Sequence, residues 1–407
     1  MKWHERYAER LDKELLEKLD RFYSEEPANE SKTFPVIIQL HENTSIKKLK
    51  DLAELLPHEE ETANIVSMNY IGAKLTPNKI EKLLLHPAVS RIHTDAVVKA
   101  KLDIATPAIG ALAVRNQYGL TGAGVTVAVV DSGIAPHEDL VTPVNRIVGF
   151  RDFVSNRTTP YDDNGHGTYV AGCIAGNGAL SGGVYTAPAP QARLVGVKVL
   201  DVNGQAPISR VIAGIDYVIQ NRSAFNIRIL NLSLGFPPSQ SYTIDPLAQA
   251  AERAMQANIF VVCAAGNTGP GGRITSPGHH PRVVTVGAVD DRRTVTRADD
   301  VRLLLTSTGP TIDGLLKPDF FVPGNLVGPK AAGSVYARQY TNFPNYLYLS
   351  STSGAAALVS GCAAQVFQAY PTYTSFQLKA LMLQVIIEFG ANYGYFTQTE
   401  LFKLLNS

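Results

Sequence analysis

Three residue types that together perform nucleophilic catalysis, a carboxylate, an imidazole and an alcohol, interrupt apolar stretches of this chain. Asp131 ends "TVAVVD", His166 stands between glycines in "DDNGHGTYVAG", and Ser353 lies in "LSSTSGAAALVSG". An alcohol is a weak nucleophile at neutral pH, so it needs a base, and an imidazole base needs an acid to hold its tautomer. The three positions supply those groups in the order Asp, His, Ser.

Each residue also has a purely structural interpretation. A lone Asp after a strand is commonly a turn residue, and Ser or Thr ahead of an Ala/Gly-rich run is commonly a helix N-cap. The structural interpretation is weaker for His166, because the flanking glycines leave its imidazole approachable from both sides. Ser353 at a helix N-terminus would meet amides and a dipole that favour a developing negative charge.

The elements that must position these residues follow a regular alternation from Val125 onward. Strands are predicted at "VTVAVV", "ARLVGVKVL", "IRILNLSLG", "IFVVCAAG" and "VVTVGAVD", with helices at "YVAGCIAG", "ISRVIAGIDYVIQ" and "PLAQAAERAMQA". Continuous apolar strands between helices predict an α/β fold, a doubly wound and mostly parallel sheet with helices on both faces. Chemistry in such a sheet belongs at the carboxyl ends of the strands, where Asp131 falls.

Taken together, these motifs resemble the subtilisin-like serine protease family, over roughly residues 105 to 400. "VVDSG", "NGHGT" and "STSGAAALVSG" correspond to that family's Asp, His and Ser boxes, and their order is the subtilisin order. The resemblance implies that Asp131, His166 and Ser353 form a catalytic triad. It also implies that Asn267, in "AAGN", supplies an oxyanion-hole donor beside the amide of the nucleophile.

The same resemblance implies how a substrate is held. "NLSLG" is similar to the family strand that pairs with substrate backbone, and "KPDFFVPG" at 317–324 is close to another family motif. Backbone pairing of this kind gives affinity and leaves specificity to pockets. The pocket candidates are small and uncharged, which predicts an apolar or broad preference. The predicted substrate-binding residues are Ser233, Leu234, Gly235, Ala264, Ala265 and Gly266.

The chain departs from the family pattern around the nucleophile. Ser351 replaces a usual Gly, Gly354, Ala357 and Leu358 replace the customary Met, Pro and His, and Tyr169 replaces a usual His. None of these changes removes a catalytic group, but catalysis depends on near-attack geometry. An alternative therefore stays open, a pseudoprotease that keeps the fold and acts as a binding protein.

The residues before the catalytic region predict a separate α+β unit. Residues 33–98 follow a βαββαβ order, with one helix at "SIKKLKDLAELL" and another at "PNKIEKLLLHP". This order resembles the family's inhibitor-type propeptide, although the topology also hosts ligand-binding domains. The resemblance implies self-cleavage between Val97 and Ala105, after Ala100 or Lys101. Apolar residues at helical spacing further predict one amphipathic helix over residues 3–22.

Composition excludes several other classes. Lys+Arg 37 against Asp+Glu 36 gives a formal charge of +1, so we expect no nucleic-acid partner, and the longest apolar runs are too short to span a membrane. The three cysteines, Cys173, Cys263 and Cys362, lie among apolar or small residues and are interpreted as buried thiols. We expect no metal site, and although structural calcium is common in the family, "AGNGALSGGVYTAPAP" at 175–190 is a poor cation cage.

The sequence therefore predicts a serine endopeptidase, made as a zymogen, that hydrolyses extended polypeptides and is inhibited by its own propeptide. We expect an N-terminal helical extension over 1–32, a propeptide domain over 33–100 and a catalytic domain over 101–407. Residues 1–26 carry charges throughout and no apolar signal core. Secretion, with a signal peptide outside this sequence, is favoured over a cytoplasmic location, which stays open.

Overall fold

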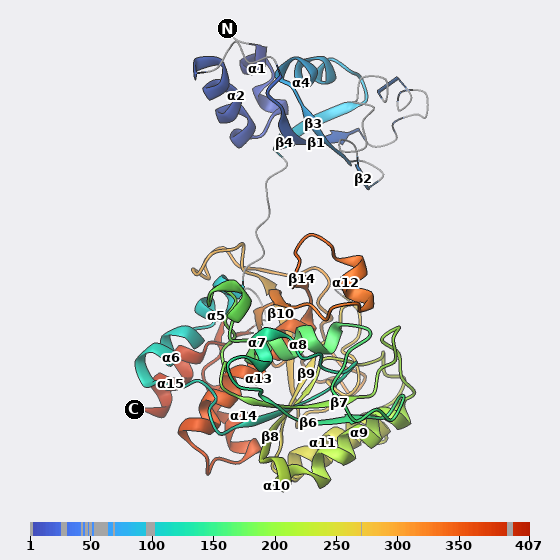
Figure 1. Ribbon diagram of the computed structural model, residues 1–407, viewed down its shortest axis with the longest axis vertical. Helices are drawn as coiled ribbons and strands as arrows, with labels where there is room; N and C mark the ends of the chain where they lie inside the picture. The colour runs from blue at the N-terminus through green and yellow to red at the C-terminus, as the bar shows by residue number, and fades with distance from the viewer. Residues whose placement is uncertain are drawn as a thin grey trace. The chain divides into compact units, whose positions relative to one another are not determined.

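The structure is a computed structural model with two compact units, Met1–Lys99 and Ala100–Ser407 (Figure 1). It describes residues 3–25, 31–41, 44, 48, 51–52, 64–67, 70–94, 102–269, 271–388 and 394–407.

The first unit is built on a four-stranded antiparallel sheet in the order β2-β3-β1-β4. Its strands are β1 (Phe34–Leu40), β2 (Asn64–Ser67), β3 (Tyr70–Leu75) and β4 (Val89–Thr94). Its helices are α1 (Trp3–Arg6), the short 3-10 helix η1 (Ala8–Arg10), α2 (Lys13–Glu25) and α4 (Pro77–Leu84). The order of β1 to β4 and the helix α4 match the prediction, whereas the helix expected at 45–56 lies largely outside the described residues.

The single helix predicted over residues 3–22 is interrupted in the structure. Leu11 forms a parallel bridge with Ile92 of β4, and the Asp12 carboxylate accepts a hydrogen bond from the Leu15 amide at 2.8 Å, which starts α2 afresh. Leu15 and Leu19 are then buried in the same core as the sheet. Residues 3–25 therefore pack with the sheet in one unit, because the apolar face of α2 is buried against the sheet.

The second unit contains a ten-stranded, mostly parallel sheet in the order β15-β16-β12-β10-β9-β8-β5-β7-β6, with β11 paired to β10. Its strands are β5 (Thr126–Asp131), β6 (Ile147–Asp152), β7 (Arg193–Lys198), β8 (Ile227–Leu232), β9 (Phe260–Ala264), β10 (Val284–Asp290), β11 (Val301–Arg302), β12 (Phe320–Pro323), β15 (Ile387–Glu388) and β16 (Gly394–Tyr395). A separate antiparallel hairpin joins β13 (Asn325–Pro329) to β14 (Tyr346–Ser350).

Helices cover both faces of this sheet (Figure 1). They are α5 (Leu102–Ala108), α6 (Ala111–Tyr118), α7 (Glu138–Val141), α8 (His166–Ala175), η2 (Ala179–Ser181), α9 (Ile208–Gln220), α10 (Arg222–Phe225), α11 (Pro246–Gln256), α12 (Val335–Gln339), α13 (Thr352–Ala369), α14 (Ser375–Gln384) and α15 (Gln398–Leu405). Along β5, Val127 and Val129 pack in the core with α8 and α13, and Ala128 and Val130 pack in the core with α9 and α11. The predicted doubly wound α/β fold is confirmed.

The chain order places a switch point at β5. β5 pairs in parallel with β7 on one side and with β8 on the other. The chain therefore continues from β5 toward both edges of the sheet, and the connecting loops separate beside the carboxyl end of β5. Ligands bind at such a point in open α/β sheets, because the connecting loops diverge there. Asp131 is the last residue of β5.

Candidate active site

Asp131 and His166 form a hydrogen-bonded pair at the end of β5. His166 is the first residue of α8, and its Nδ1 lies 2.8 Å from Oδ1 and 3.0 Å from Oδ2 of Asp131. The Asp131 side chain is fully buried, and its Oδ1 also accepts a hydrogen bond from the Ser132 amide at 2.7 Å. A carboxylate facing Nδ1 favours the tautomer that carries its proton there, which leaves Nε2 free to accept a proton.

The environment of His166 acts on its pKa in opposite directions. Burial lowers the pKa, and the charge of Asp131 together with its hydrogen bond raises it, so that the net pKa lies above the ordinary 6.5 of a histidine. Only 15% of the side chain is exposed. The imidazolium that forms on proton transfer is therefore stabilised by the same carboxylate that orients the ring.

The turn that leads into His166 depends on a second buried carboxylate, Asp162. Its Oδ1 accepts from the Ser132 hydroxyl at 2.9 Å and from the Gly165 amide at 2.8 Å, and its Oδ2 accepts from the Thr168 amide and hydroxyl at 2.9 and 2.7 Å. Gly165 has φ of 106°, a left-handed conformation that favours glycine. A Cβ there would also lie 2.6 Å from the Ser334 hydroxyl oxygen, so the position has no room for a side chain.

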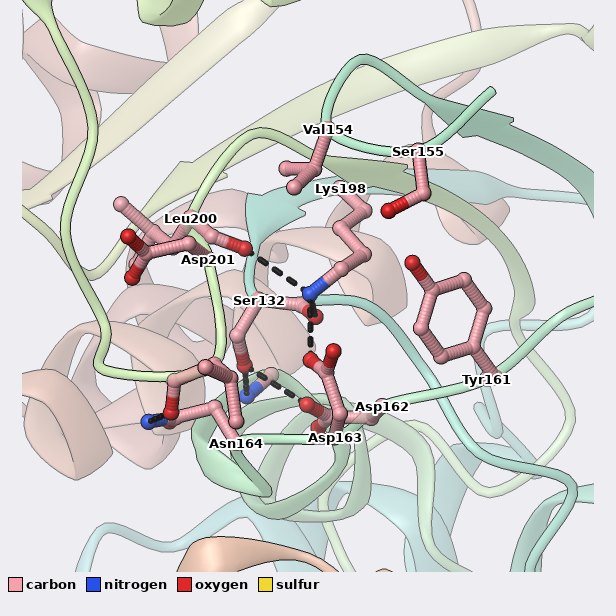
Figure 2. Close-up of polar contacts among 12 residues, drawn as sticks. Ser132, Val154, Ser155, Tyr161, Asp162, Asp163, Asn164, Lys198, Leu200 and Asp201 are labelled. Carbon is pink, nitrogen blue, oxygen red and sulfur yellow. Dashed lines mark hydrogen bonds and ion pairs between the residues drawn. The ribbon is translucent and has the colours of Figure 1, made fainter. Parts of the chain in front are cut away.

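A buried lysine ties this turn to the ends of two strands, as Figure 2 shows. The Lys198 ammonium, at the end of β7, donates to the carbonyls of Ser132 and Leu200 at 2.7 and 2.8 Å and to the Asp163 carboxylate at 2.7 Å. Its side chain is fully buried, so those three acceptors replace the water that its charge has lost. The sequence singled out neither Lys198 nor Asp162, because nothing local to them indicates which groups they reach.

Ser353 lies in the first turn of α13, as its helical environment in the sequence predicted. The residue that caps this helix is Ser351, whose hydroxyl accepts from the Gly354 amide at 3.1 Å, while the Thr352 amide donates to the Asn267 side chain at 3.0 Å. Among the described residues the amide of Ser353 has no hydrogen-bond acceptor. The N-cap interpretation is thus correct for Ser351, and the Ser353 amide remains as the donor open to a ligand.

Asn267 has its amide group oriented by Thr352. Its Oδ1 accepts from the Thr352 amide at 3.0 Å and from the Thr352 hydroxyl at 2.9 Å. A backbone amide can only donate, so the oxygen must face it, and the Nδ2 donor points away from Thr352. The Thr352 hydroxyl in turn accepts from the Gly266 amide at 3.2 Å. Sequence reasoning missed Thr352, although it directly precedes Ser353.

The Ser353 hydroxyl donates to the Ser233 carbonyl at 3.2 Å, and the Ser233 hydroxyl donates to the Ser353 carbonyl at 2.9 Å. Within the part of the chain that the structure describes, no hydrogen bond joins Ser353 to His166. Catalytic hydrogen bonds are often long without substrate, and a serine hydroxyl reaches a new acceptor by rotating about one bond. His166 and Ser353 both line the same cavity.

That cavity has a volume of about 970 Å³ and contains most of the predicted site. Its lining includes Ser233, Leu234, Gly235, Ala264, Gly266 and Asn267 with His166 and Ser353. Ala265 does not line it: the side chain is fully buried, its amide donates to Val286 and its carbonyl accepts from Thr275. Tyr336, which the sequence did not single out, also lines the cavity and packs edge-on to the His166 ring at 6.0 Å between centroids.

The residues that depart from the family pattern are accommodated behind the nucleophile. Ala357 and Leu358 are fully buried in the core that contains α8 and α13, and Ser351 caps α13 without lining the cavity. Tyr169 is fully buried as well. These residues leave the Asp131–His166 hydrogen bonds in place, and Ser353 lines the same cavity as His166.

The three cysteines are free and buried, and burial raises the pKa of each thiol, that of Cys263 to about 12. Among the described residues no three His, Cys, Asp or Glu side chains are arranged so that they could hold a metal ion. A search of the same residues finds no helix with the length and apolarity needed to cross a membrane.

Known proteins with similar sequences and structures agree with this fold. Residues 122–400 match the model of the Subtilase family. The chain is 38% identical to "Serine protease AprX" of Bacillus subtilis over 89% of its length and 85% of that protein, and 33% identical to "Thermostable alkaline protease" of Halalkalibacterium halodurans over 89% of each. The crystal structure of a cold adapted subtilisin-like serine proteinase matches 69% of this chain and 89% of that one, with 30% identity and a TM-score of 0.54.

The fold, the Asp–His pair and these similarities define a serine protease built on a doubly wound α/β sheet. The chain belongs to the Subtilase family. It is a subtilisin-like serine endopeptidase, as the sequence motifs predicted.

Asp131→Asn is expected to lower the pKa of His166, because burial would then act without the opposing carboxylate charge. The pKa is measured by NMR titration of the ring nitrogens between about pH 4 and pH 9, in a Ser353→Ala background. A His166 pKa that stays constant or rises would contradict the assignment of Asp131 as the group that raises it.

Proposed function

We propose that Asp131, His166 and Ser353 act as the catalytic triad of this endopeptidase. The observation that supports the proposal most strongly is the buried Asp131–His166 pair, whose imidazole lines one cavity with Ser353. In the proposed reaction, Ser353 Oγ attacks the scissile carbonyl carbon while His166 Nε2 accepts its proton. His166 then protonates the leaving amine, and water, activated by the same nitrogen, hydrolyses the acyl-enzyme.

Two donors are available for the oxyanion of the tetrahedral intermediate. The Ser353 amide has no acceptor among the described residues, and the Asn267 Nδ2 group is turned away from Thr352. Both belong to residues that line the cavity. Preorganised donors of this kind stabilise the charge that develops in the transition state more than they stabilise the substrate.

We infer that the substrate is an extended polypeptide bound along Ser233–Gly235, which directly follow β8. Within the described residues, the backbone groups of Leu234 and Gly235 make no hydrogen bonds, so they are available to a substrate strand. The small Ala264 and Gly266 line the cavity near Asn267, which supports an apolar or broad preference at the residue before the scissile bond.

A fluorophosphonate should react with the unchanged chain at Ser353, and Ser353→Ala should abolish both this labelling and peptide hydrolysis. The physical reason is that only a serine whose proton is accepted by a base is nucleophilic enough to be phosphonylated. Mass spectrometry of the labelled peptide identifies the modified residue. A folded chain that is not labelled would instead support the pseudoprotease alternative, and labelling at another serine would contradict the triad.

Asn267→Ala should lower kcat with little change in KM, by roughly the 10²- to 10³-fold known for the corresponding donor of subtilisin itself. Thr352→Val should lower kcat by about tenfold, because it removes one of the two hydrogen bonds that orient Asn267. Thr352→Ser keeps the hydroxyl and is the matched control, expected to stay near the unchanged rate. Steady-state kinetics on a peptide substrate separate the two parameters, and a loss confined to KM would count against the assignment.

We further propose that the first unit is an inhibitory propeptide. Three observations support this proposal: its antiparallel sheet with α4 between β3 and β4, its separate core, and the similarity to the named proteases, which covers more of the chain than Ala100–Ser407 alone could supply. The cleavage proposed after Ala100 or Lys101 lies outside the described residues.

The propeptide proposal predicts one cut between Val97 and Ala105 in the unchanged chain and none in Ser353→Ala. Isolated residues 1–100 should inhibit the mature enzyme competitively at sub-micromolar concentration, which corresponds to roughly 8 kcal/mol or more of binding free energy. Mass spectrometry of the mature N-terminus and an inhibition titration are the two measurements. The unit has another role if no cut occurs in this window and residues 1–100 do not inhibit.

A further inference from the structure

The Tyr169 side chain extends from α8, which carries the proposed base, toward α13, which carries the proposed nucleophile. Tyr169 follows His166 by three residues on α8, and the two rings lie 6.5 Å apart between centroids. Its side chain is fully buried and reaches toward the first turn of α13. One side chain therefore contacts both the imidazole and the backbone next to Ser353.

Gly354, the residue after Ser353, is the position that receives the hydroxyl end of Tyr169. A Cβ on Gly354 would lie 2.7 Å from the Tyr169 hydroxyl oxygen and 2.8 Å from Cδ1 of Leu326. Real Cβ atoms do not approach other atoms so closely, so a side chain at 354 requires movement of Tyr169 or of α13. Glycine is unfavourable inside a helix, and this contact gives the physical reason for its presence.

The ring of Tyr169 lies against a second glycine. A Cβ on Gly328, in β13, would lie 2.7 Å from Cδ2 of the ring. Strand β13 pairs with β14, and β14 leads directly into Ser351. The Tyr169 side chain thus lies against two glycines, one next to Ser353 in α13 and one in the hairpin that leads into α13.

The hydroxyl of Tyr169 lies against the backbone that leads into the nucleophile. It donates to the Leu349 carbonyl at 3.5 Å and contacts the hydroxyl of Ser351, the residue that caps Gly354. Burial raises the pKa of Tyr169 well above its ordinary value, so the hydroxyl keeps its proton near neutral pH. Three of the departures from the family pattern, at 169, 351 and 354, therefore form one contact group.

We propose that Tyr169 is a positioning residue that sets the separation between His166 and Ser353, and that Gly354 makes room for it. This inference rests on the proposed roles of those two residues. A spacer of fixed length between α8 and α13 determines how far Ser353 Oγ lies from Nε2 of His166, and an error of about 1 Å in such a distance can lower a rate about 10²-fold. The absence of a side chain at Gly354 leaves the space next to the Tyr169 hydroxyl free.

The test is a double-mutant cycle with Tyr169→Phe and Gly354→Ala, measured by kcat, KM and the rate of fluorophosphonate labelling. Gly354→Ala alone should lower kcat and the labelling rate by about 10- to 100-fold with KM nearly constant, because the methyl group displaces Ser353. Tyr169→Phe alone should lower both rates by about threefold to tenfold, since one hydroxyl contact is lost. The double variant should return to within about threefold of Tyr169→Phe, because the methyl group takes the space of the hydroxyl.

Tyr346→Phe is the matched control. Tyr346 is another buried tyrosine, its hydroxyl donates to the Asp139 carboxylate, and it contacts neither His166 nor Ser353. This variant should lose thermal stability and keep its labelling rate and kcat. An equal loss of rate in Tyr346→Phe and Tyr169→Phe would overturn the inference, because any buried hydroxyl would then have the same effect.

The inference also fails if the double variant loses as much as the product of the two single losses, or if the losses appear in KM. Should Gly354→Ala not fold, a folded and active double variant would support the coupling. If neither folds, Tyr169→Phe decides by itself: a slower labelling rate supports the inference and an unchanged rate overturns it. Failure of the proposed function is distinguishable, because the unchanged chain would then not be labelled at Ser353.

Discussion

The site depends first on how the chain buries the charge of Asp131. A carboxylate removed from water is strongly destabilising unless hydrogen bonds replace its hydration. Asp131 obtains them from the Ser132 amide and from His166 Nδ1, at the end of a strand that is buried along its whole length. His166 cannot turn away without leaving this carboxylate poorly satisfied, so the buried charge fixes the ring, its tautomer and the direction of Nε2.

The same principle extends to the turn in front of His166. Asp162 accepts hydrogen bonds from Ser132, Gly165 and Thr168, and Lys198 donates to the carbonyl of Ser132 and to the next carboxylate along the chain. Ser132 therefore belongs to both groups of contacts. In a buried network of this kind the loss of one member leaves others unsatisfied, so the position of His166 depends on all of them together.

Close packing of helices positions Ser353. α13 is buried along most of its length, and small residues let its backbone approach α8: a Cβ on Gly361 would lie 2.8 Å from the carbonyl oxygen of Ile174. In such an interface every added or removed atom must be matched across the contact. The same constraint applies at Gly354, where a Cβ would lie 2.7 Å from the Tyr169 hydroxyl oxygen.

The sequence by itself determined the α/β class and the strand and helix order of the second unit, because hydrophobic period is a local property. It also predicted Asp131, His166 and Ser353 from their residue chemistry, and Asn267 from the family resemblance. Only the tertiary structure decided that Thr352 orients Asn267, that Ala265 lies outside the cavity, that Leu11 interrupts the first helix, and that Tyr169 meets Gly354. Each of these features depends on contacts between segments that are far apart in the chain. Local pattern fixes which face of an element is buried, but the partner that a side chain meets is fixed only when whole elements pack together.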